Sequence, residues 1–184
     1  MVNNGNIVYF VSSNIPSISN FTTDLSVVEA SLSCVPSLSV ISCAMCVPQR
    51  SEIKANHTEW VNMVKPNLGP GIRERVQEAI ASEDESAMDD LHAVRTDFNT
   101  TMHLLNLQEA GILAIPTVPG APAKLGMDAA LLENFRARAF SLLSIAGLSG
   151  FCQASIPLGT RCGVPVSVSL LPRHGADRSM LLLR

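Results

Sequence analysis

Apolar residues recur at helical spacing in three stretches of the chain. The first stretch, over 72–80, follows Pro70, which can open a helix. The second covers 88–105, and the third starts after Asp128 and is ended by the Gly-Leu-Ser-Gly sequence at 147–150. Spacings of three and four residues between apolar positions are typical of amphipathic helices. The chain therefore contains three predicted helices between residues 70 and 150.

Continuous and alternating apolar runs predict three short strands. The run over 112–115 is uninterrupted and typical of a buried strand, and the stretch over 151–156 ends at a proline and a glycine. Residues 166–170 alternate between apolar residues and serine, which predicts a strand with one apolar face. A further helix is expected to begin at Asp177. Helices alternating with such strands indicate an α/β fold, and strands this apolar suit one side of a larger sheet.

The first 49 residues differ from the rest. Their apolar positions follow no steady period, apart from a short strand predicted over 7–11, and they include ten serines. Only two charges occur there, Asp24 and Glu29, and all 13 Lys and Arg residues lie from Arg50 onward. This stretch lacks the basic residues of a secretory signal or a transit peptide. We expect an atypical, poorly ordered Ser-rich leader over 1–49 and a separate unit over 50–184.

Composition limits the classes of function. The 184 residues are 47% apolar and 16% charged, with a net charge of −3. These values argue against disorder and against a basic surface for nucleic acid. No apolar run reaches the roughly 18 residues of a membrane span. The lack of a signal sequence and the odd number of cysteines favour a cytoplasmic location.

Few residues suggest catalysis or metal binding. Cys43 and Cys46 form a CxxC pair, but no second pair follows at finger spacing, so we expect incidental thiols and no metal or cofactor. Ser149 between glycines and Cys152 near a histidine (His103 or His174) are alternative nucleophiles, for which a helix end and a packed strand are the favoured interpretations. The acidic run over 83–90 is interpreted as a solvated helix start, and Trp60 and Phe140 as core residues.

Four stretches from Lys54 onward resemble the C-terminal part of amidase signature enzymes. They are Val-Lys-Pro-Asn-Leu-Gly-Pro-Gly-Ile at 64–72, Ile-Pro-Thr-Val-Pro-Gly-Ala-Pro at 115–122, the helical stretch 135–147, and Ser-Gly-Phe-Cys-Gln-Ala-Ser-Ile-Pro-Leu-Gly at 149–159 with the strand at 165–171. The Phe-Cys-Gln sequence is similar to a plant subgroup that contains indole-acetamide amidases and an amidase-like chloroplast import receptor. The resemblance covers roughly 130 residues and does not include 1–49.

The resemblance implies a partial amidase-signature fold, a mixed sheet flanked by helices. Enzymes of the family hydrolyse carboxamides with a Lys, a bridging Ser and a nucleophilic Ser in a Gly-Gly-Ser-Ser-Gly-type loop, and backbone N–H groups near that loop hold the oxyanion. The 184 residues contain no such loop. We therefore assign no catalytic residue and no metal ligand. The resemblance implies a substrate-pocket wall formed by Thr117, Phe140, Phe151 and Cys152.

Three interpretations of function follow from the resemblance. The first is a truncated amidase-family protein, inactive alone, which would act on a small amide if the missing half were supplied. The second is a non-catalytic interaction module related to the import receptor, with chloroplast envelope association. The third is that residues 1–49 derive from non-coding sequence and the natural protein is longer. No nucleic-acid partner and no membrane span of the chain are expected, and exposed strands favour self-association through the sheet edge.

Overall fold

The computed structural model describes residues 5–20, 36–69, 71–82, 88–105 and 111–182, and all statements below concern these ranges. The elements in chain order are α1 (Ile7–Asn14), the 3-10 helix η1 (Pro16–Asn20), α3 (Pro36–Val64), α4 (Ile72–Ala81), α5 (Met88–Leu105), β1 (Ile112–Pro116), α6 (Ala129–Ser149), β2 (Ala154–Arg161), β3 (Val164–Pro172) and α7 (Asp177–Leu181).

Three predicted helices are confirmed as α4, α5 and α6. The Asp128 carboxylate caps α6 by accepting hydrogen bonds from the backbone N–H groups of Ala130 and Leu131, at 3.0 and 3.2 Å. Gly150 ends α6 in the left-handed conformation, at φ 66°. The acidic residues Asp89 and Asp90 lie in the first turn of α5 as expected, whereas Pro70, Cys34 and the acidic positions 83–85 lie outside the described residues.

A three-stranded antiparallel sheet in the order β1-β3-β2 confirms the α/β class. β2 continues through Pro157, where the sequence predicts a stop, to Arg161. This is possible because β2 has no neighbour on its outer edge in the described sheet, and the register shifts between Pro157 and Gly159. The β2–β3 turn places Cys162 and Gly163 at φ 52° and 75°, as a two-residue hairpin turn requires. β1 is the other edge strand and buries only Ile115, so the prediction of a fully buried strand there is wrong.

The stretch 7–11 is helical, so the predicted strand there is wrong. The Asn6 side chain accepts hydrogen bonds from the backbone N–H groups of Val8 and Tyr9, which starts helix α1. Val11 is fully buried at its centre. The described residues before position 20 therefore join the folded core.

Helix α3 continues without interruption across position 49, where the sequence places a boundary. Val40, Ile41 and Ala44 of α3 are buried together with residues of α5 and α6. Several apolar side chains of residues 5–20 and 36–49 are thus buried in the same cluster as those of α5 and α6, and the division of the chain at position 49 stays a prediction. The core is formed by one cluster of buried residues: Val11, Ile15, Ile18, Leu38, Val40, Ile41, Ala44, Leu91, Val94, Phe98, Met102, Ile115, Ile145, Ala146, Leu148, Phe151 and Leu171.

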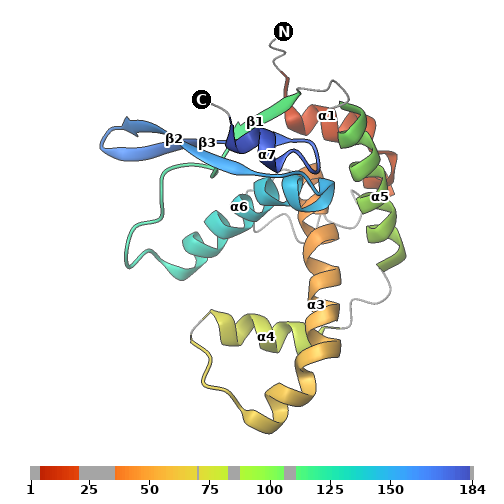
Figure 1. Cartoon of the computed structure of the whole chain (residues 1–184). Helices are drawn as coiled ribbons and strands as arrows, with labels where there is room; N and C mark the ends of the chain where they lie inside the picture. The colour runs from red at the N-terminus through yellow and green to blue at the C-terminus, as the bar shows by residue number, and fades with distance from the viewer. Residues whose placement is uncertain (1–4, 21–35, 70, 83–87, 106–110, 183–184) are drawn as a thin grey trace.

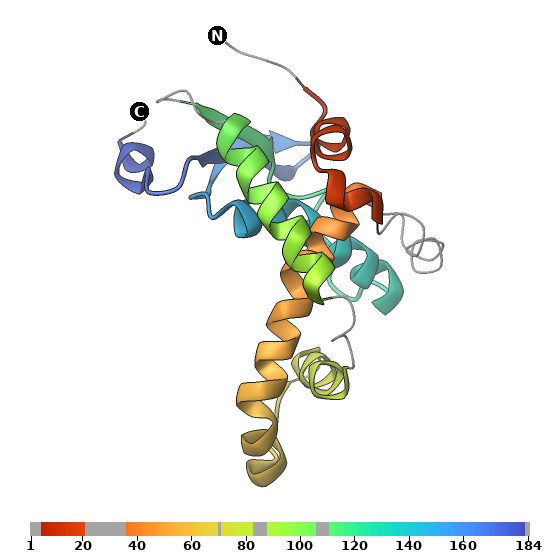
Figure 2. The same cartoon turned by 90° about the vertical axis from the view of Figure 1, so that its right-hand side faces the viewer.

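Figure 1 shows α3 running through the molecule, with α5 and α6 beside its first half and α4 beside its far end. The view in Figure 2 shows the same arrangement, with the sheet and α1 at one end and the α3–α4 pair protruding at the other. The protruding part leaves Trp60 47% exposed, so the interpretation of Trp60 as a core residue is wrong. Because the α3–α4 end protrudes, a functional site is expected at the other end of the molecule. That end contains the sheet, α5 and the end of α6.

Candidate functional site

A cluster of four polar side chains, which we call the hydroxyl cluster, spans the three strands near the end of β1. It consists of Thr117, Gln153, Ser155 and Ser169. The strand register places Ser155 and Ile115 directly opposite Ser169, so these three side chains share one face of the sheet. Thr117 follows β1 and Gln153 precedes β2. Chain segments far apart in sequence thus bring four hydrogen-bonding groups together.

Ser169 is the centre of the hydroxyl cluster and is fully buried. Its Oγ lies 2.9 Å from Gln153 Nε2, 3.2 Å from Ser155 Oγ and 3.0 Å from Thr117 Oγ1. These distances are those of ordinary hydrogen bonds. A buried hydroxyl is costly unless it is satisfied, and here three partners satisfy it.

A tightly bonded junction follows α6 and leads into β2. Asn99 Nδ2 donates to the carbonyl oxygens of Leu148 and Ser149 at 3.3 and 3.1 Å, which satisfies carbonyls that the helix end leaves open. His174 Nδ1 lies 2.8 Å from the Gly150 carbonyl oxygen. Because a carbonyl only accepts, the proton of this bond lies on His174 Nδ1.

The two predicted wall residues Phe151 and Cys152 lie at this junction. The Phe151 ring is buried and meets the His103 ring edge to face, with centroids 5.2 Å apart. The Cys152 thiol donates to the Arg173 carbonyl oxygen at 3.7 Å. Burial, and secondarily the Asp177 carboxylate, raises the pKa of the Cys152 thiol. A raised pKa leaves the thiol protonated near neutral pH, which is unfavourable for a nucleophile.

The other two predicted wall residues lie elsewhere. Thr117 belongs to the hydroxyl cluster, whereas Phe140 lies in α6, roughly 14 Å along the helix from Ser149 at the usual rise per residue. The Phe140 ring lies under the Arg75 guanidinium, 5.9 Å from its centroid, and Arg75 also pairs with Glu133 at 4.0 Å. Phe140 thus joins α4 to α6. The contacts place Phe140 apart from Phe151 and Cys152, and whether the four residues form a wall in a larger protein stays a prediction.

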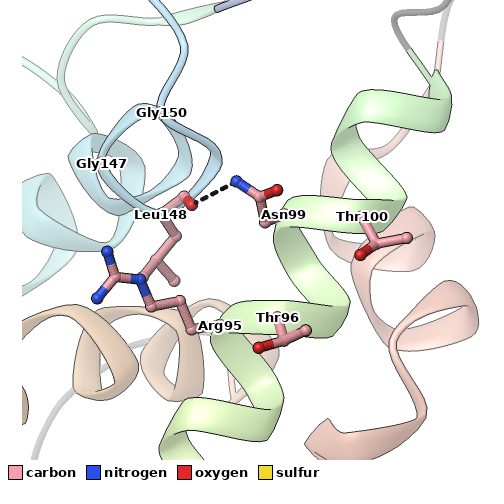
Figure 3. Close-up of a pocket in the computed structure, with 7 residues that line it drawn as sticks. All are labelled: Arg95, Thr96, Asn99, Thr100, Gly147, Leu148 and Gly150. Carbon is pink, nitrogen blue, oxygen red and sulfur yellow. Dashed lines mark hydrogen bonds between the residues drawn. The ribbon is translucent and has the colours of Figure 1, made fainter.

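A surface hollow of about 300 Å³ lies between α5 and the end of α6, as Figure 3 shows. The residues that line it are Arg95, Thr96, Asn99, Thr100, Gly147, Leu148 and Gly150. The Thr96 hydroxyl donates to the His92 carbonyl within its own helix. Asn99 is already engaged with the end of α6, as the dashed line in Figure 3 marks. Two of the four polar side chains of the lining, those of Thr96 and Asn99, are thus used within the fold.

The alternative nucleophile Ser149 is buried and donates to the Ile145 carbonyl at 2.7 Å. It is a helix-end residue, as the favoured interpretation has it. Within the described ranges, no group of three or more His, Cys, Asp or Glu side chains could hold a metal ion. No described helix is long and apolar enough to span a membrane.

The sequence pattern does not reveal three members of the hydroxyl cluster, namely Gln153, Ser155 and Ser169. The alternation over 166–170 predicts the strand correctly but suggests that its apolar side faces the core. The structure has the opposite arrangement at this point, with Ser169 fully buried and Val166 40% exposed. Two serines and a glutamine at matching register could have indicated the cluster, but only once the strand pairing is known.

No family model matches the chain. Amidase 1 of Oryza sativa subsp. japonica is 62% identical over 181 residues, which are 98% of this chain and 41% of that protein. Amidase 1 of Arabidopsis thaliana is 48% identical over 97% of this chain and 41% of its own length. Outer envelope protein 64, chloroplastic, of Arabidopsis thaliana is 36% identical over 96% of this chain and 29% of its own length. The chain spans about two fifths of the amidases that it matches.

Solved structures share the fold. A crystal structure of an amidase matches with a TM-score of 0.57 at 21% identity, over 72% of this chain and 31% of that one. The urea amidolyase of K. lactis matches with a TM-score of 0.61 at 16% identity, over 97% of this chain and 11% of that one. At such identities the likeness concerns the fold alone.

Fold and sequence together define the class as an amidase signature protein, over the C-terminal portion of such proteins. The chain belongs to the amidase signature family, with Amidase 1 of rice and of Arabidopsis among its relatives. The match over 181 residues also extends into 1–49, where the quoted motifs show no resemblance. Within this stretch, Val11, Val40, Ile41 and Ala44 are buried in the common core.

Proposed function

We propose that this chain is the C-terminal portion of a carboxamide hydrolase and does not hydrolyse amides alone. The observation that carries the proposal is the 62% identity to Amidase 1 over nearly the whole chain, of which the chain spans only 41%. By the family resemblance, the Lys and the two Ser residues of the reaction belong to the preceding portion of such enzymes. The chain would supply the sheet and part of the pocket wall to that machinery.

The chemistry requires both portions. A neutral Lys takes a proton through one Ser from the nucleophilic Ser, which attacks the amide carbon, and ammonia leaves before water releases the acid. Backbone N–H groups near the glycine-rich loop stabilise the oxyanion. The described part of this chain offers no substitute, since Ser149 is buried and the Cys152 thiol has a raised pKa.

Complementation tests the proposal. The purified chain is incubated with indole-3-acetamide, alone and with a polypeptide that corresponds to the preceding portion of rice Amidase 1, and released ammonia is measured. We expect no turnover by the chain alone and turnover by the mixture. A matched mixture in which the loop serine of the added polypeptide is replaced by alanine must be inactive. Turnover by the chain alone would overturn the proposal.

A second candidate function is that of a non-catalytic interaction module. It is favoured by the 36% identity to outer envelope protein 64 and by the outward sheet face, where Ile156 and Val166 are more than a third exposed. Such a face favours association, including self-association of the chain. Sedimentation velocity of the chain and of Ile156→Lys decides: a concentration-dependent shift that Ile156→Lys removes supports this candidate, and a monomer at all concentrations contradicts it.

Cytoplasmic residence and association with the chloroplast envelope are the two proposals for location. The names of relatives favour the envelope, since they include a chloroplastic outer envelope protein and a chloroplast outer-membrane translocon protein of Pisum sativum, 40% identical over 79% of this chain. Fractionation of plant cells that express the tagged chain distinguishes the two. Recovery with washed chloroplasts supports the envelope, and recovery in the supernatant supports the cytoplasm.

A further inference from the structure

The two edges of the sheet differ in the backbone hydrogen bonds that they leave open. β1 and β2 are the outer strands, and β3 lies between them (Figure 1). In an antiparallel pair, opposite residues alternate between those that exchange two backbone hydrogen bonds and those that exchange none. The N–H and carbonyl groups of the second kind point away from the neighbouring strand. Prolines reveal this alternation, because proline has no N–H and fits only the second kind.

On β1, the backbone groups of Ile112 and Ala114 face outward. Pro116 lies opposite Val168, and Ile112 lies opposite Pro172. Neither pair can exchange two hydrogen bonds, so the bonds to β3 are made at the alternate positions. The N–H and carbonyl groups of Ile112 and Ala114 therefore point away from β3. They meet no partner among the residues that the structure describes.

The outer edge of β2 is blunted by a proline. Since β3 uses alternate residues for β1, it bonds to β2 through the others, among them Val168 opposite Ile156. Pro157, the next residue of β2, therefore faces outward, where it offers no donor. The register then shifts between Pro157 and Gly159. A proline and a bulge both hinder the addition of a further strand, so β1 has the more open edge.

We propose that the outer edge of β1 binds the same edge of a second copy of this chain, so that two sheets join into one. With the two strands antiparallel and Leu113 opposite Leu113 of the second copy, Ile112 of each chain lies opposite Ala114 of the other. Both pairs then exchange two backbone hydrogen bonds, because Ile112 and Ala114 carry the open groups. This inference goes beyond both candidate functions, since it concerns neither amide hydrolysis nor the outward sheet face.

A second copy fits this edge because the edge is self-complementary and uncharged. A two-fold axis through Leu113 places each open donor opposite an open acceptor, as an isologous contact requires. Residues 111–123 contain no charged side chain, so nothing on the strand repels a like copy. Ile112 is 40% exposed and Leu113 packs against the core cluster, so the joined strands also bring apolar side chains together on both faces.

Sedimentation velocity of the full chain over a range of concentrations tests the inference, with Ala114→Pro as the variant. Proline at this position removes an outward N–H and no bond to β3, so the variant should fold. It should weaken dimerisation by about thirtyfold, which corresponds to about 2 kcal/mol for the two hydrogen bonds lost from the dimer. Ala129→Pro is the matched control, because Ala129 is the first residue of α6, where proline is tolerated. It should leave the dimer unchanged.

Amide exchange measured by NMR on the ¹⁵N-labelled chain reports the edge directly. The amides of Ile112 and Ala114 should exchange at least about tenfold more slowly in the dimer than in the monomer, because exchange from the dimer requires dissociation. The amide of Thr160 is the control. Thr160 lies opposite Pro165 at the outer edge of β2, and its exchange should not depend on concentration.

A dimer that a folded Ala114→Pro leaves intact overturns the inference, as does exchange at Ile112 and Ala114 that is independent of concentration. Monomers at every concentration overturn it too, and leave the edge to a different chain, such as the polypeptide added in the complementation experiment. A dimer that Ile156→Lys removes and Ala114→Pro does not supports the second candidate function and contradicts the edge contact. If Ala114→Pro does not fold, amide exchange in the unmodified chain decides.

Discussion

The two halves of α3 belong to one helix but have opposite surroundings. The first half, residues 36–47, carries no charged side chain and buries Leu38, Val40, Ile41 and Ala44. The second half, residues 50–64, begins with Arg50 and contains no buried residue, and α4 is the element packed along it. The charge asymmetry of the sequence therefore marks where a helix leaves the core.

The two halves of α3 should differ most in how far the removal of an apolar side chain lowers the free energy of unfolding. Ile41→Ala should lower the free energy of unfolding by about 2–4 kcal/mol, because Ile41 is fully buried. Val64→Ala, at a position 56% exposed, should change it by no more than about 0.5 kcal/mol. Urea unfolding of both variants measures this. An equal loss of unfolding free energy in Ile41→Ala and Val64→Ala would mean that the first half of α3 is not part of the core.

A close approach of α6 to the first half of α3 gives the second prediction. A Cβ added at Gly147 would lie 2.6 Å from Met45 Sδ. Gly147→Ala should therefore lower the free energy of unfolding by about 1 kcal/mol, the overpacking cost exceeding the gain in helix propensity. In a Met45→Ala background the same change should be stabilising, since the obstacle is gone. Thermal unfolding of the unmodified chain, of the two single variants and of the double variant gives the sign of the change that Gly147→Ala makes to the free energy of unfolding. If that sign is the same in the unmodified background and in the Met45→Ala background, the contact between Gly147 and Met45 is contradicted.

In the second half, a lysine fixes α4. Lys54 Nζ donates to the Ser82 carbonyl oxygen at 2.6 Å, at the C-terminal end of α4. Lys54→Met should lower the free energy of opening α4 by somewhat less than 1 kcal/mol, the net value of a partly exposed hydrogen bond. Hydrogen exchange of the α4 amides measures it. Exposed Lys65→Met is the control and should leave exchange unchanged, and slower or unchanged exchange in Lys54→Met would contradict the bond.

The smallest expected effect is a pH dependence at the start of α4. Backbone N–H groups of Glu74 itself and of Gly71 lower the pKa of the Glu74 carboxyl. A lowered pKa stabilises the folded form above the unfolded pKa of about 4.3. This contribution is lost as pH falls through the lower folded value. Hydrogen exchange of the first α4 amides should accelerate as the pH falls below the unfolded pKa, and it should do so more in the unmodified chain than in Glu74→Gln. Identical pH profiles of exchange in the unmodified chain and in Glu74→Gln would rule the contribution out.

The sequence predicts well those elements whose signals are local. Helix α6 has a capping Asp128 and a terminal Gly150, and both act as expected. Helix α1 was hidden because its cap, Asn6, precedes a run of residues that equally suits a strand. In the first half of α3, the buried positions 37, 40, 41 and 44 do follow helical spacing. Serine at position 37 and the intervening serines and cysteines obscure that period, because they are buried or half-buried without being apolar.

The candidate site depended on pairing that no local pattern contains. Thr117 follows one strand and Ser169 lies within another, 52 residues later. Alternation along β3 predicts a strand, but either face can be the buried one. Only the order β1-β3-β2 and its register bring Thr117, Ser155 and Ser169 together. The resemblance implies a pocket wall that includes Thr117, which stays a prediction, whereas the hydrogen-bonding partners of Thr117 follow from the fold.

The buried serines of α6 have a mechanical consequence. Ser144 and Ser149 donate to the carbonyl oxygens of Phe140 and Ile145, four residues earlier in their own helix. Their hydroxyls are thus satisfied without a bond to a neighbouring element. The serine hydroxyls therefore leave the position of this helix face to the shape of its neighbours, whereas the end of α6 is also held by Asn99 of α5, which donates to the Leu148 and Ser149 carbonyl oxygens. When a larger protein surrounds this fold, α6 can shift along its neighbours without breaking the hydroxyl bonds of Ser144 and Ser149, and such a shift acts on the two Asn99 bonds alone of those named here.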